Sequence, residues 1–249
     1  MRISIITATY NSSRTILDCI ESVQNQTFKE IDHIIVDGES RDDTIALIRS
    51  VPNRISKIIS EQDKGIYDAM NKGIEFSSGE IVAILNSDDL YIDEFVIEKV
   101  MGIFETTGTD CVYGDLFYVD KLNTNSIVRS WKTDKYKPFA FYKGWHPAHP
   151  SFFLKKKVYD TYGYFDLSFS LAADFELMLR MIERFHIDSV YYPFPLVKMR
   201  LGGKTNISLK NIYLQNRECI RAFEKNGLKV SKLYPFYRLI PKLKQFSSR

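Results

Sequence analysis

The chain has 249 residues, of which 45% are hydrophobic and 26% are charged, and its formal net charge at pH 7 is +3. This size suits one large α/β domain, alone or with a helical appendage, and the small charge does not indicate a nucleic-acid-binding protein. Three widely spaced cysteines without a CxxC pair argue against a disulfide framework or a zinc site, and no apolar run reaches the roughly 20 residues that span a bilayer.

Short apolar runs alternate with amphipathic segments over the first 85 residues. Strands are expected at residues 3–6, 33–36, 55–59 and 81–85. The segments between them repeat apolar residues at helical spacing, and Ser12 or Ser13 is expected to cap the first helix. This alternation predicts a doubly wound, mostly parallel sheet, which binds ligands beyond the carboxyl ends of its strands.

A polar segment follows each of these strands. The four segments are residues 7–11, 37–40, 63–65 and 86–89. Each of them alone could be a simple turn. Because the carboxyl ends of parallel strands meet at one edge of a sheet, the four together predict a single composite pocket.

The segment Asn86-Ser87-Asp88-Asp89 ends the most apolar of the expected strands. Two adjacent carboxylates repel each other unless a cation lies beside them. Mg²⁺ and Mn²⁺ take oxygen ligands and bridge one or two carboxylates to substrate phosphates, which predicts a metal–diphosphate site at Asp88 with Asp89 close by. The alternative is a turn that caps a helix starting near Ile92.

The second half of the chain is less regular. A helix is expected over residues 92–104, a strand over 111–119, a substrate-facing loop region over 123–142, and a strand broken by prolines over 189–201. Two histidines, His146 and His149, lie among prolines without a third metal ligand nearby. They could form local hydrogen bonds, or His149 could contact a sugar or phosphate.

Asp174 lies in the first turn of an expected helix, where the helix dipole favours a carboxylate. This placement alone would account for an acidic residue there. The chain becomes helical again from residue 207 and has no acidic residue after Glu224. Basic and aromatic residues alternate in this tail, so it could bind an anionic membrane surface or pack a few aromatic side chains on the domain.

Four of these segments together resemble family 2 glycosyltransferases of the GT-A fold. They are Thr7-Ala8-Thr9-Tyr10-Asn11, Val36-Asp37-Gly38-Glu39-Ser40, residues 63–73 and Leu85-Asn86-Ser87-Asp88-Asp89. They occur in the family's order and spacing over roughly residues 1–205, and the most similar members build bacterial exopolysaccharide, capsule or O-antigen, including colanic-acid enzymes. The resemblance implies a GT-A domain over residues 1–205, with a nucleotide-sugar half (1–105) and an acceptor half (106–205), and a basic helical extension over 206–249.

The resemblance also implies roles for single residues. The expected nucleotide-sugar contacts are Thr7, Ala8 and Tyr10 at the base, Asp37 at the base or ribose, Asp63, Lys64 and Gly65 near the nucleotide, and Asn86, Ser87 and Asp88 at the family's D-x-D position. Asp88 would hold Mn²⁺ or Mg²⁺, and Asp174 would be the catalytic base. Asp89, His149 and Ala173 are further expected contacts to the acceptor or to phosphate.

The implied activity is an inverting transfer of a sugar from a nucleotide-diphospho-sugar, with a UDP-sugar favoured, to a glycan or lipid-linked acceptor. Because the chain enters a strand at once and lacks the apolar region of a signal peptide, we expect a cytoplasmic enzyme, with peripheral contact to the inner face of the plasma membrane through its tail.

Two departures from the family pattern leave other functions open. Asn86 replaces the first Asp of D-x-D, and Ala173 replaces the Glu of a Glu-Asp pair. A catalytically inactive protein that binds nucleotide-sugars is therefore an alternative. A sugar nucleotidyltransferase or a nicotinamide-dependent dehydrogenase is disfavoured, because residues 7–13 contain no glycine and those enzymes need a Gly-rich loop there.

Overall fold

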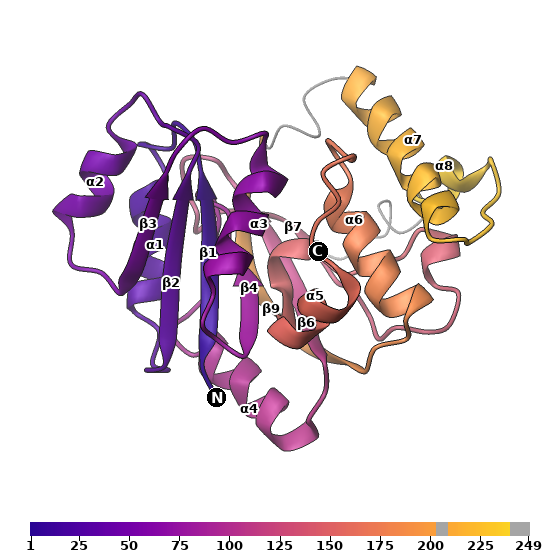
Figure 1. Cartoon of the computed structure of the whole chain (residues 1–249), viewed down its shortest axis with the longest axis horizontal. Helices are drawn as coiled ribbons and strands as arrows, with labels where there is room; N and C mark the ends of the chain where they lie inside the picture. The colour runs from indigo at the N-terminus through magenta and orange to yellow at the C-terminus, as the bar shows by residue number, and fades with distance from the viewer. Residues whose placement is uncertain (203–208, 240–249) are drawn as a thin grey trace.

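The computed structural model describes residues 1–202 and 209–239. Over these residues the chain forms one mixed sheet of nine strands with helices packed against it (Figure 1). The order of the strands along the sheet is β3-β2-β1-β4-β8-β6-β9-β5, with β7 paired to β6. The predicted α/β class, with helices flanking a central sheet, is confirmed.

The first part of the sheet is parallel, as predicted. Its elements are β1 (Ile3–Thr9), α1 (Ile16–Gln24), β2 (Ile31–Asp37), α2 (Thr44–Ser50), β3 (Ile55–Ser60), α3 (Ile66–Phe76) and β4 (Ile81–Ile84). Every residue of β1 and β4 is buried, which explains why these strands are continuous apolar or β-branched runs. The first helix begins at Ile16 rather than at Ser12 or Ser13, and no side chain caps it.

The second part of the sheet is mixed. Its strands are β5 (Leu90–Tyr91), β6 (Cys111–Val119), β7 (Ile127–Trp131), β8 (Phe152–Lys155) and β9 (Ser189–Arg200). β8 lies between β4 and β6 and is antiparallel to both, while β9 is parallel to β6. The strands β1, β2, β4, β6 and β9 therefore all point their carboxyl ends to the same edge of the sheet.

Several expectations for this part were wrong. The region 123–142 contains a strand, β7, which pairs with β6. The prolines in β9 do not break it, because shifts in its register with β6 near Asp115 absorb the bend. The helix expected over residues 92–104 is α4 (Val96–Thr107), and its N-cap residue is Phe95. The segment 86–89 therefore does not cap this helix.

The remaining helices cover the second part of the sheet. They are η1 (Phe141–Lys143), η2 (His149–Ser151), α5 (Lys156–Tyr162), α6 (Ala173–Met178), η3 (Leu179–Arg184), α7 (Leu209–Lys225) and α8 (Tyr234–Tyr237). The segment η3 continues α6 as a π-helix. None of the described helices is both long and apolar enough to cross a membrane.

The C-terminal helices α7 and α8 are part of the hydrophobic core. Cys219, Phe223 and Tyr234 are fully buried and belong to the same core cluster as side chains of β1, β4 and α6. In Figure 1 the two helices lie beside α6, at the end of the molecule far from β3. The expected aromatic packing of the tail is thus present, and its last ten residues, 240–249, lie outside the described part.

Candidate active site

The polar loops at the carboxyl edge of the sheet are hydrogen-bonded to one another. The hydroxyls of Ser12, after β1, and Ser87, after β4, lie 2.8 Å apart. The loop after β1 also meets the loop after β2, because the Asn11 backbone N–H donates to Ser40 Oγ at 2.8 Å and Asn11 Oδ1 accepts from the Arg41 N–H at 2.9 Å. Three of the four predicted polar segments therefore form one continuous surface.

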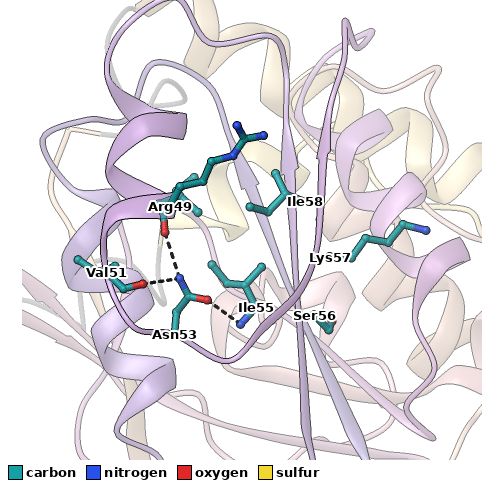
Figure 2. Close-up of a pocket in the computed structure, with 8 residues that line it drawn as sticks. Arg49, Val51, Asn53, Ile55, Ser56, Lys57 and Ile58 are labelled. Carbon is teal, nitrogen blue, oxygen red and sulfur yellow. Dashed lines mark hydrogen bonds between the residues drawn. The ribbon is translucent and has the colours of Figure 1, made fainter.

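A hollow of about 470 Å³ lies elsewhere, at the edge strand β3 (Figure 2). Asn53 shapes it by donating to the carbonyls of Ile48 and Val51 at 3.0 and 2.9 Å and by accepting from the Ile55 N–H at 3.1 Å. Its lining includes Arg49 and Lys57 but none of the predicted site residues. The candidate site is therefore defined by converging side chains and not by this hollow.

The residues predicted to meet the base differ in their exposure. Thr7 and Ala8 are buried in β1, and Thr7 Oγ1 lies 3.0 Å from Nε2 of His33. Their contact with a base stays a prediction. Tyr10 is 53% exposed. Of these three predicted contacts, Tyr10 is the one whose ring is free to stack on a ligand.

Tyr10 and Asp63 converge above Gly38. A Cβ atom at Gly38 would lie 2.5 Å from Asp63 Oδ2 and 3.5 Å from Tyr10 Cδ2, so a larger residue here would displace the Asp63 carboxylate. The other oxygen of Asp63 accepts from the Gly65 N–H at 2.8 Å, which holds the turn that starts α3. Lys64, between them, is exposed.

Asp37 is buried and is held by groups of the protein itself. Its carboxylate accepts from the Ser40 N–H at 3.0 Å, from the Ser40 hydroxyl and from the Ser60 hydroxyl at 2.7 Å. Asp37 thereby shapes the loop after β2. Its contact with a base or ribose stays a prediction.

The segment after β4 has unpaired oxygen atoms beside Asp88. Asn86 donates from Nδ2 to Asp89 Oδ2 at 3.1 Å, but Asn86 Oδ1 and Asp89 Oδ1 are buried and have no hydrogen-bond partner among the described residues. Burial, and then the Asp88 charge, raise the pKa of Asp89 well above its usual range. Oxygen atoms of this kind next to a carboxylate fit a hard divalent cation.

Protein side chains alone do not complete a metal site here. No group of three or more His, Cys, Asp or Glu side chains within residues 1–202 and 209–239 is arranged to hold a metal ion. Mg²⁺ and Mn²⁺ sites commonly use one or two carboxylates and take further ligands from water and substrate phosphates. The residues present therefore fit a cation that binds together with a diphosphate.

Arg200 joins the end of β9 to this segment. Its guanidinium donates to the Asp88 backbone carbonyl at 2.7 Å and forms an ion pair with Asp18 on α1. Nothing in the sequence indicated this role, since Arg200 is more than 100 residues from Asp88. Its effect is to hold the Asp88 backbone in place.

Asp174 and His149, predicted separately as site residues, lie side by side. Nδ1 of His149 is 3.2 Å from Asp174 Oδ2, and the Tyr67 hydroxyl donates to Asp174 Oδ1 at 3.1 Å. The register of β8 explains the position of His149: Ala83 pairs with Phe153, so the residues before β8 lie at the carboxyl end of β4.

The turn that carries His149 links the two acidic groups. His149 contacts Asp174, and its turn η2 packs against β4, whose carboxyl end leads into the segment Asn86–Asp89. The segment after β4 and the start of α6 therefore lie on either side of this turn.

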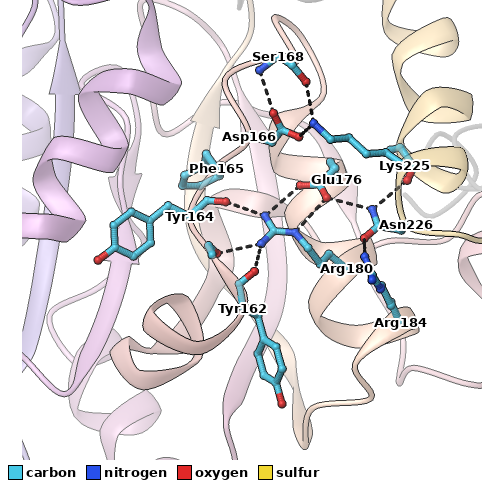
Figure 3. A network of polar contacts seen from close by, with 12 residues as sticks. Tyr162, Tyr164, Phe165, Asp166, Ser168, Glu176, Arg180, Arg184, Lys225 and Asn226 are labelled. Atoms are coloured by element: carbon cyan, nitrogen blue, oxygen red, sulfur yellow. Dashed lines mark hydrogen bonds and ion pairs between the residues drawn. The ribbon is translucent and has the colours of Figure 1, made fainter.

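Buried contacts hold α6 in position (Figure 3). The Arg180 guanidinium binds both oxygens of Glu176 at 3.0 Å and donates to the carbonyls of Tyr162, Gly163 and Tyr164. Asn226, at the end of α7, donates to Glu176 Oε1 at 3.0 Å. The end of α7 is thus linked to α6, the helix that carries Asp174.

Glu218 on α7 supports the start of α6. Its carboxylate accepts from the backbone N–H groups of Ser170, Leu171 and Ala172 at 3.0, 2.8 and 2.9 Å. Neither Glu218 nor Tyr67 was predicted as a site residue. Tyr67 lies inside the motif 63–73 and could have been found there, whereas the pairing of Glu218 depends on how α7 packs.

Comparisons with known proteins identify the family of this chain. The family description "Glycosyl transferase family 2" matches residues 4–163. The chain is 32% identical over 180 residues to an uncharacterized glycosyltransferase of Mycobacterium tuberculosis, covering 72% of this chain and 68% of that one. It is 25% identical over 246 residues to an uncharacterized glycosyltransferase of Methanocaldococcus jannaschii, covering 95% and 78%.

Solved structures have the same fold. The crystal structure of S. aureus TarS in complex with UDP has a TM-score of 0.70 at 16% identity, covering all of this chain and 72% of that one. The mannosyltransferase PcManGT from Pyrobaculum calidifontis, in complex with GDP-Man and Mn²⁺, has a TM-score of 0.66 at 16% identity, covering 98% and 69%. The fold is therefore GT-A, and the chain belongs to glycosyl transferase family 2.

Proposed function

We propose that the protein transfers a sugar from a nucleotide-diphospho-sugar to an acceptor hydroxyl with inversion at the anomeric carbon. The observation that carries this proposal is that Asp174 contacts His149, whose turn packs against β4 just before the Asp88–Asp89 segment. The chemistry requires one group to bind the diphosphate and another to take a proton. These two acidic groups supply the two functions.

The donor binds across the carboxyl edge of the sheet. Tyr10 stacks on the base above Gly38, with Thr7 and Ala8 below it, and Asp37, Asp63, Lys64 and Gly65 line the nucleotide. Asn86, Ser87 and Asp88 meet the diphosphate, and Asp88 holds Mn²⁺ or Mg²⁺. TarS and PcManGT were solved with UDP and with GDP-Man and Mn²⁺, which supports a nucleotide donor and a divalent cation.

The reaction is a single displacement. Asp88 would hold the divalent cation, which would supply positive charge next to the leaving diphosphate. Asp174 accepts the proton of the acceptor hydroxyl, whose oxygen forms the new bond to the anomeric carbon while the old bond to the diphosphate breaks. General-base catalysis of this kind contributes typically about 10²- to 10⁴-fold to the rate. A base on the face opposite the leaving group makes inversion the outcome.

Residues 1–105 bind the donor and residues 106–205 the acceptor in this proposal. The acceptor is a lipid-linked glycan of cell-surface polysaccharide synthesis, and residues 206–249 contact the membrane. The exposed side chains of Leu233, Phe236 and Leu239 support this proposal, because they lie on a segment that carries Lys229 and Lys232 and no acidic residue. Such a surface suits anionic lipid.

The test is a thermal-shift screen of UDP-, GDP- and TDP-sugars, each with and without Mn²⁺ or Mg²⁺. A ligand that binds the native state raises the melting temperature. We expect one nucleotide family to stabilise the protein only with metal, and D88A to abolish that shift. D188A, at an exposed aspartate on the opposite edge of the sheet, is the matched control and keeps it.

Two results would contradict the proposal. A shift without metal that survives in D88A would remove the metal role of Asp88. Binding with no turnover of the bound donor, even to slow hydrolysis, would favour the inactive nucleotide-sugar-binding protein that Asn86 and Ala173 leave open.

A further inference from the structure

Two side chains hold the Asp174 carboxylate, one at each oxygen. The Tyr67 hydroxyl donates to Oδ1 at 3.1 Å, and Nδ1 of His149 lies 3.2 Å from Oδ2. Tyr67 is the second residue of α3 and His149 the first residue of η2, so the two contacts come from different halves of the chain. Asp174 is where these halves meet.

Tyr67 is itself fixed in place. Its ring stacks on Phe165 at 5.6 Å, and Asn71, one turn later on α3, exchanges two hydrogen bonds with the Phe165 backbone at 2.8 and 2.9 Å. Burial, and then the Asp174 charge, raise the pKa of Tyr67 well above its usual range. Tyr67 therefore remains a protonated donor to Asp174 at any pH at which the protein works.

His149 is carried by a rigid turn. The two residues after it, Pro150 and Ser151, are buried, and the Ser151 hydroxyl donates to the Gly114 carbonyl at 2.9 Å. The turn packs against β4, β6 and β9. The imidazole side chain is 27% exposed and the Asp174 side chain 21%, so the pair is accessible from the site.

We propose that His149 and Tyr67 are positioning residues for Asp174, and that the active form has neutral His149 donating its Nδ1–H to Oδ2. This inference rests on the proposed function, because it assumes that Asp174 takes the acceptor proton. One donor on each oxygen fixes the plane of the carboxylate and leaves lone pairs free for the acceptor hydroxyl. A misplacement of about 1 Å at a reacting group can cost about 10²-fold in rate.

Other charged and aromatic groups lie near this pair. The charge of Arg238, directly after α8, interacts with that of Asp174, and Arg129 on β7 stacks on Tyr118. The Glu218 carboxylate on α7 accepts three backbone hydrogen bonds at the start of α6. His146 lies three residues before His149, and its ring packs edge-on against Phe175 at 5.5 Å.

The experiment compares H149A, H149N, Y67F and D174N with the wild type. In H149N, the asparagine Nδ2 occupies the place of the imidazole Nδ1–H and can donate in its stead. H186N is the matched control, since His186 is exposed and has φ 51°, which asparagine tolerates well. The readout is kcat and donor KM for hydrolysis of UDP-GlcNAc or GDP-mannose, whichever stabilises the protein, with Mn²⁺.

We expect H149A to lower kcat about 10- to 100-fold with little change in donor KM. H149N should recover most of this loss, and Y67F should lower kcat with little change in donor KM. H186N should match the wild type. If H149A does not fold, H149N and Y67F still provide the test.

Three outcomes would overturn the inference. In the first, H149A keeps the wild-type kcat. In the second, H149A raises donor KM at constant kcat, which would make His149 a phosphate contact. In the third, H149N is as inactive as D174N, which would mean that His149 Nε2 takes the proton itself. Full activity in D174N would instead contradict the proposed function.

Discussion

The carboxylate of Glu218 on α7 accepts a hydrogen bond of 2.9 Å from the backbone N–H of Ala172, two residues before Asp174. It also accepts from the N–H groups of Ser170 and Leu171. Helix α7 therefore supplies a hydrogen-bond acceptor to the backbone N–H groups at the start of α6, which would otherwise lack one. Through this contact α7 contributes to the placement of Asp174, the proposed base.

Replacing Glu218 should affect both stability and turnover. Unpaired N–H groups that are partly buried cost about 1–3 kcal/mol, so we expect E218A to lower the free energy of unfolding by that amount. We also expect kcat to fall more than donor KM rises, because α6 loses its support near Asp174. Chemical denaturation and donor hydrolysis measure the two effects.

The control for this prediction is E224A, at an exposed glutamate on the same helix. It should leave both quantities close to those of the wild type. If E218A and E224A behave alike, α7 does not position the start of α6.

Two ion pairs at the same i,i+4 helical spacing should contribute differently to the free energy of unfolding. The Arg180–Glu176 pair is buried, with side-chain exposures of 11% and 3%, and is bonded to Asn226. Removing one partner of a buried pair leaves an uncompensated charge, so R180Q should cost about 3–5 kcal/mol of unfolding free energy. Urea denaturation measures this loss.

The matched comparison is K156Q. Lys156 pairs with Asp160 at the same i,i+4 spacing on the surface, with exposures of 24% and 48%. Exposed pairs contribute about 1 kcal/mol or less. Equal losses of unfolding free energy in R180Q and K156Q would mean that the Arg180–Glu176 pair is not buried in solution.

The protein should lose stability in mild acid because His33 is buried. It is fully buried on β2, and burial lowers its pKa from 6.5 to about 4. The folded protein thus favours neutral His33. The contribution of neutral His33 to the free energy of unfolding is complete above pH 6.5 and is lost as the pH falls toward 4. Between pH 7 and 4.5 the loss is roughly 2 to 3 kcal/mol.

The variant H33Q isolates this effect. Its amide occupies the place of Nε2 beside Thr7 and does not titrate. The raised pKa of Asp89 acts in the opposite direction in both proteins, so the measured quantity is the difference between them. An identical dependence of unfolding free energy on pH in wild type and H33Q would contradict the prediction.

Phe236 should contribute to membrane binding. Its side chain is 66% exposed on α8, next to Leu233 and Leu239. Burial of an exposed Phe side chain in lipid is worth about 1.5–3 kcal/mol, so F236S should weaken binding to phosphatidylglycerol vesicles about 10- to 100-fold in a sedimentation assay. Vesicles of phosphatidylcholine alone should bind weakly.

The matched control is F194S, at a phenylalanine on β9 with 56% exposure. It should bind the anionic vesicles as the wild type does. Equal binding by F236S and the wild type would count against a lipid contact through α8.

The sequence by itself determined the first half of the fold and the order of the polar loops. Four apolar runs and the helical periodicity between them are local signals, because parallel strands buried on both faces need continuous apolar residues. Asp88 and Asp174 could be singled out from recognisable motifs. Asp88 follows a buried strand, and Asp174 lies in the first turn of a helix. Their chemistry also follows from their residue type.

Only the tertiary structure decided which of these residues meet. The insertion of β8 between β4 and β6 brings His149 to the carboxyl end of β4, and no local pattern encodes an antiparallel strand of four residues at that place. Tyr67, Glu218 and Arg200 contact site segments between 46 and 112 residues away. Such contacts depend on packing between distant elements, which hydrophobic periodicity does not specify.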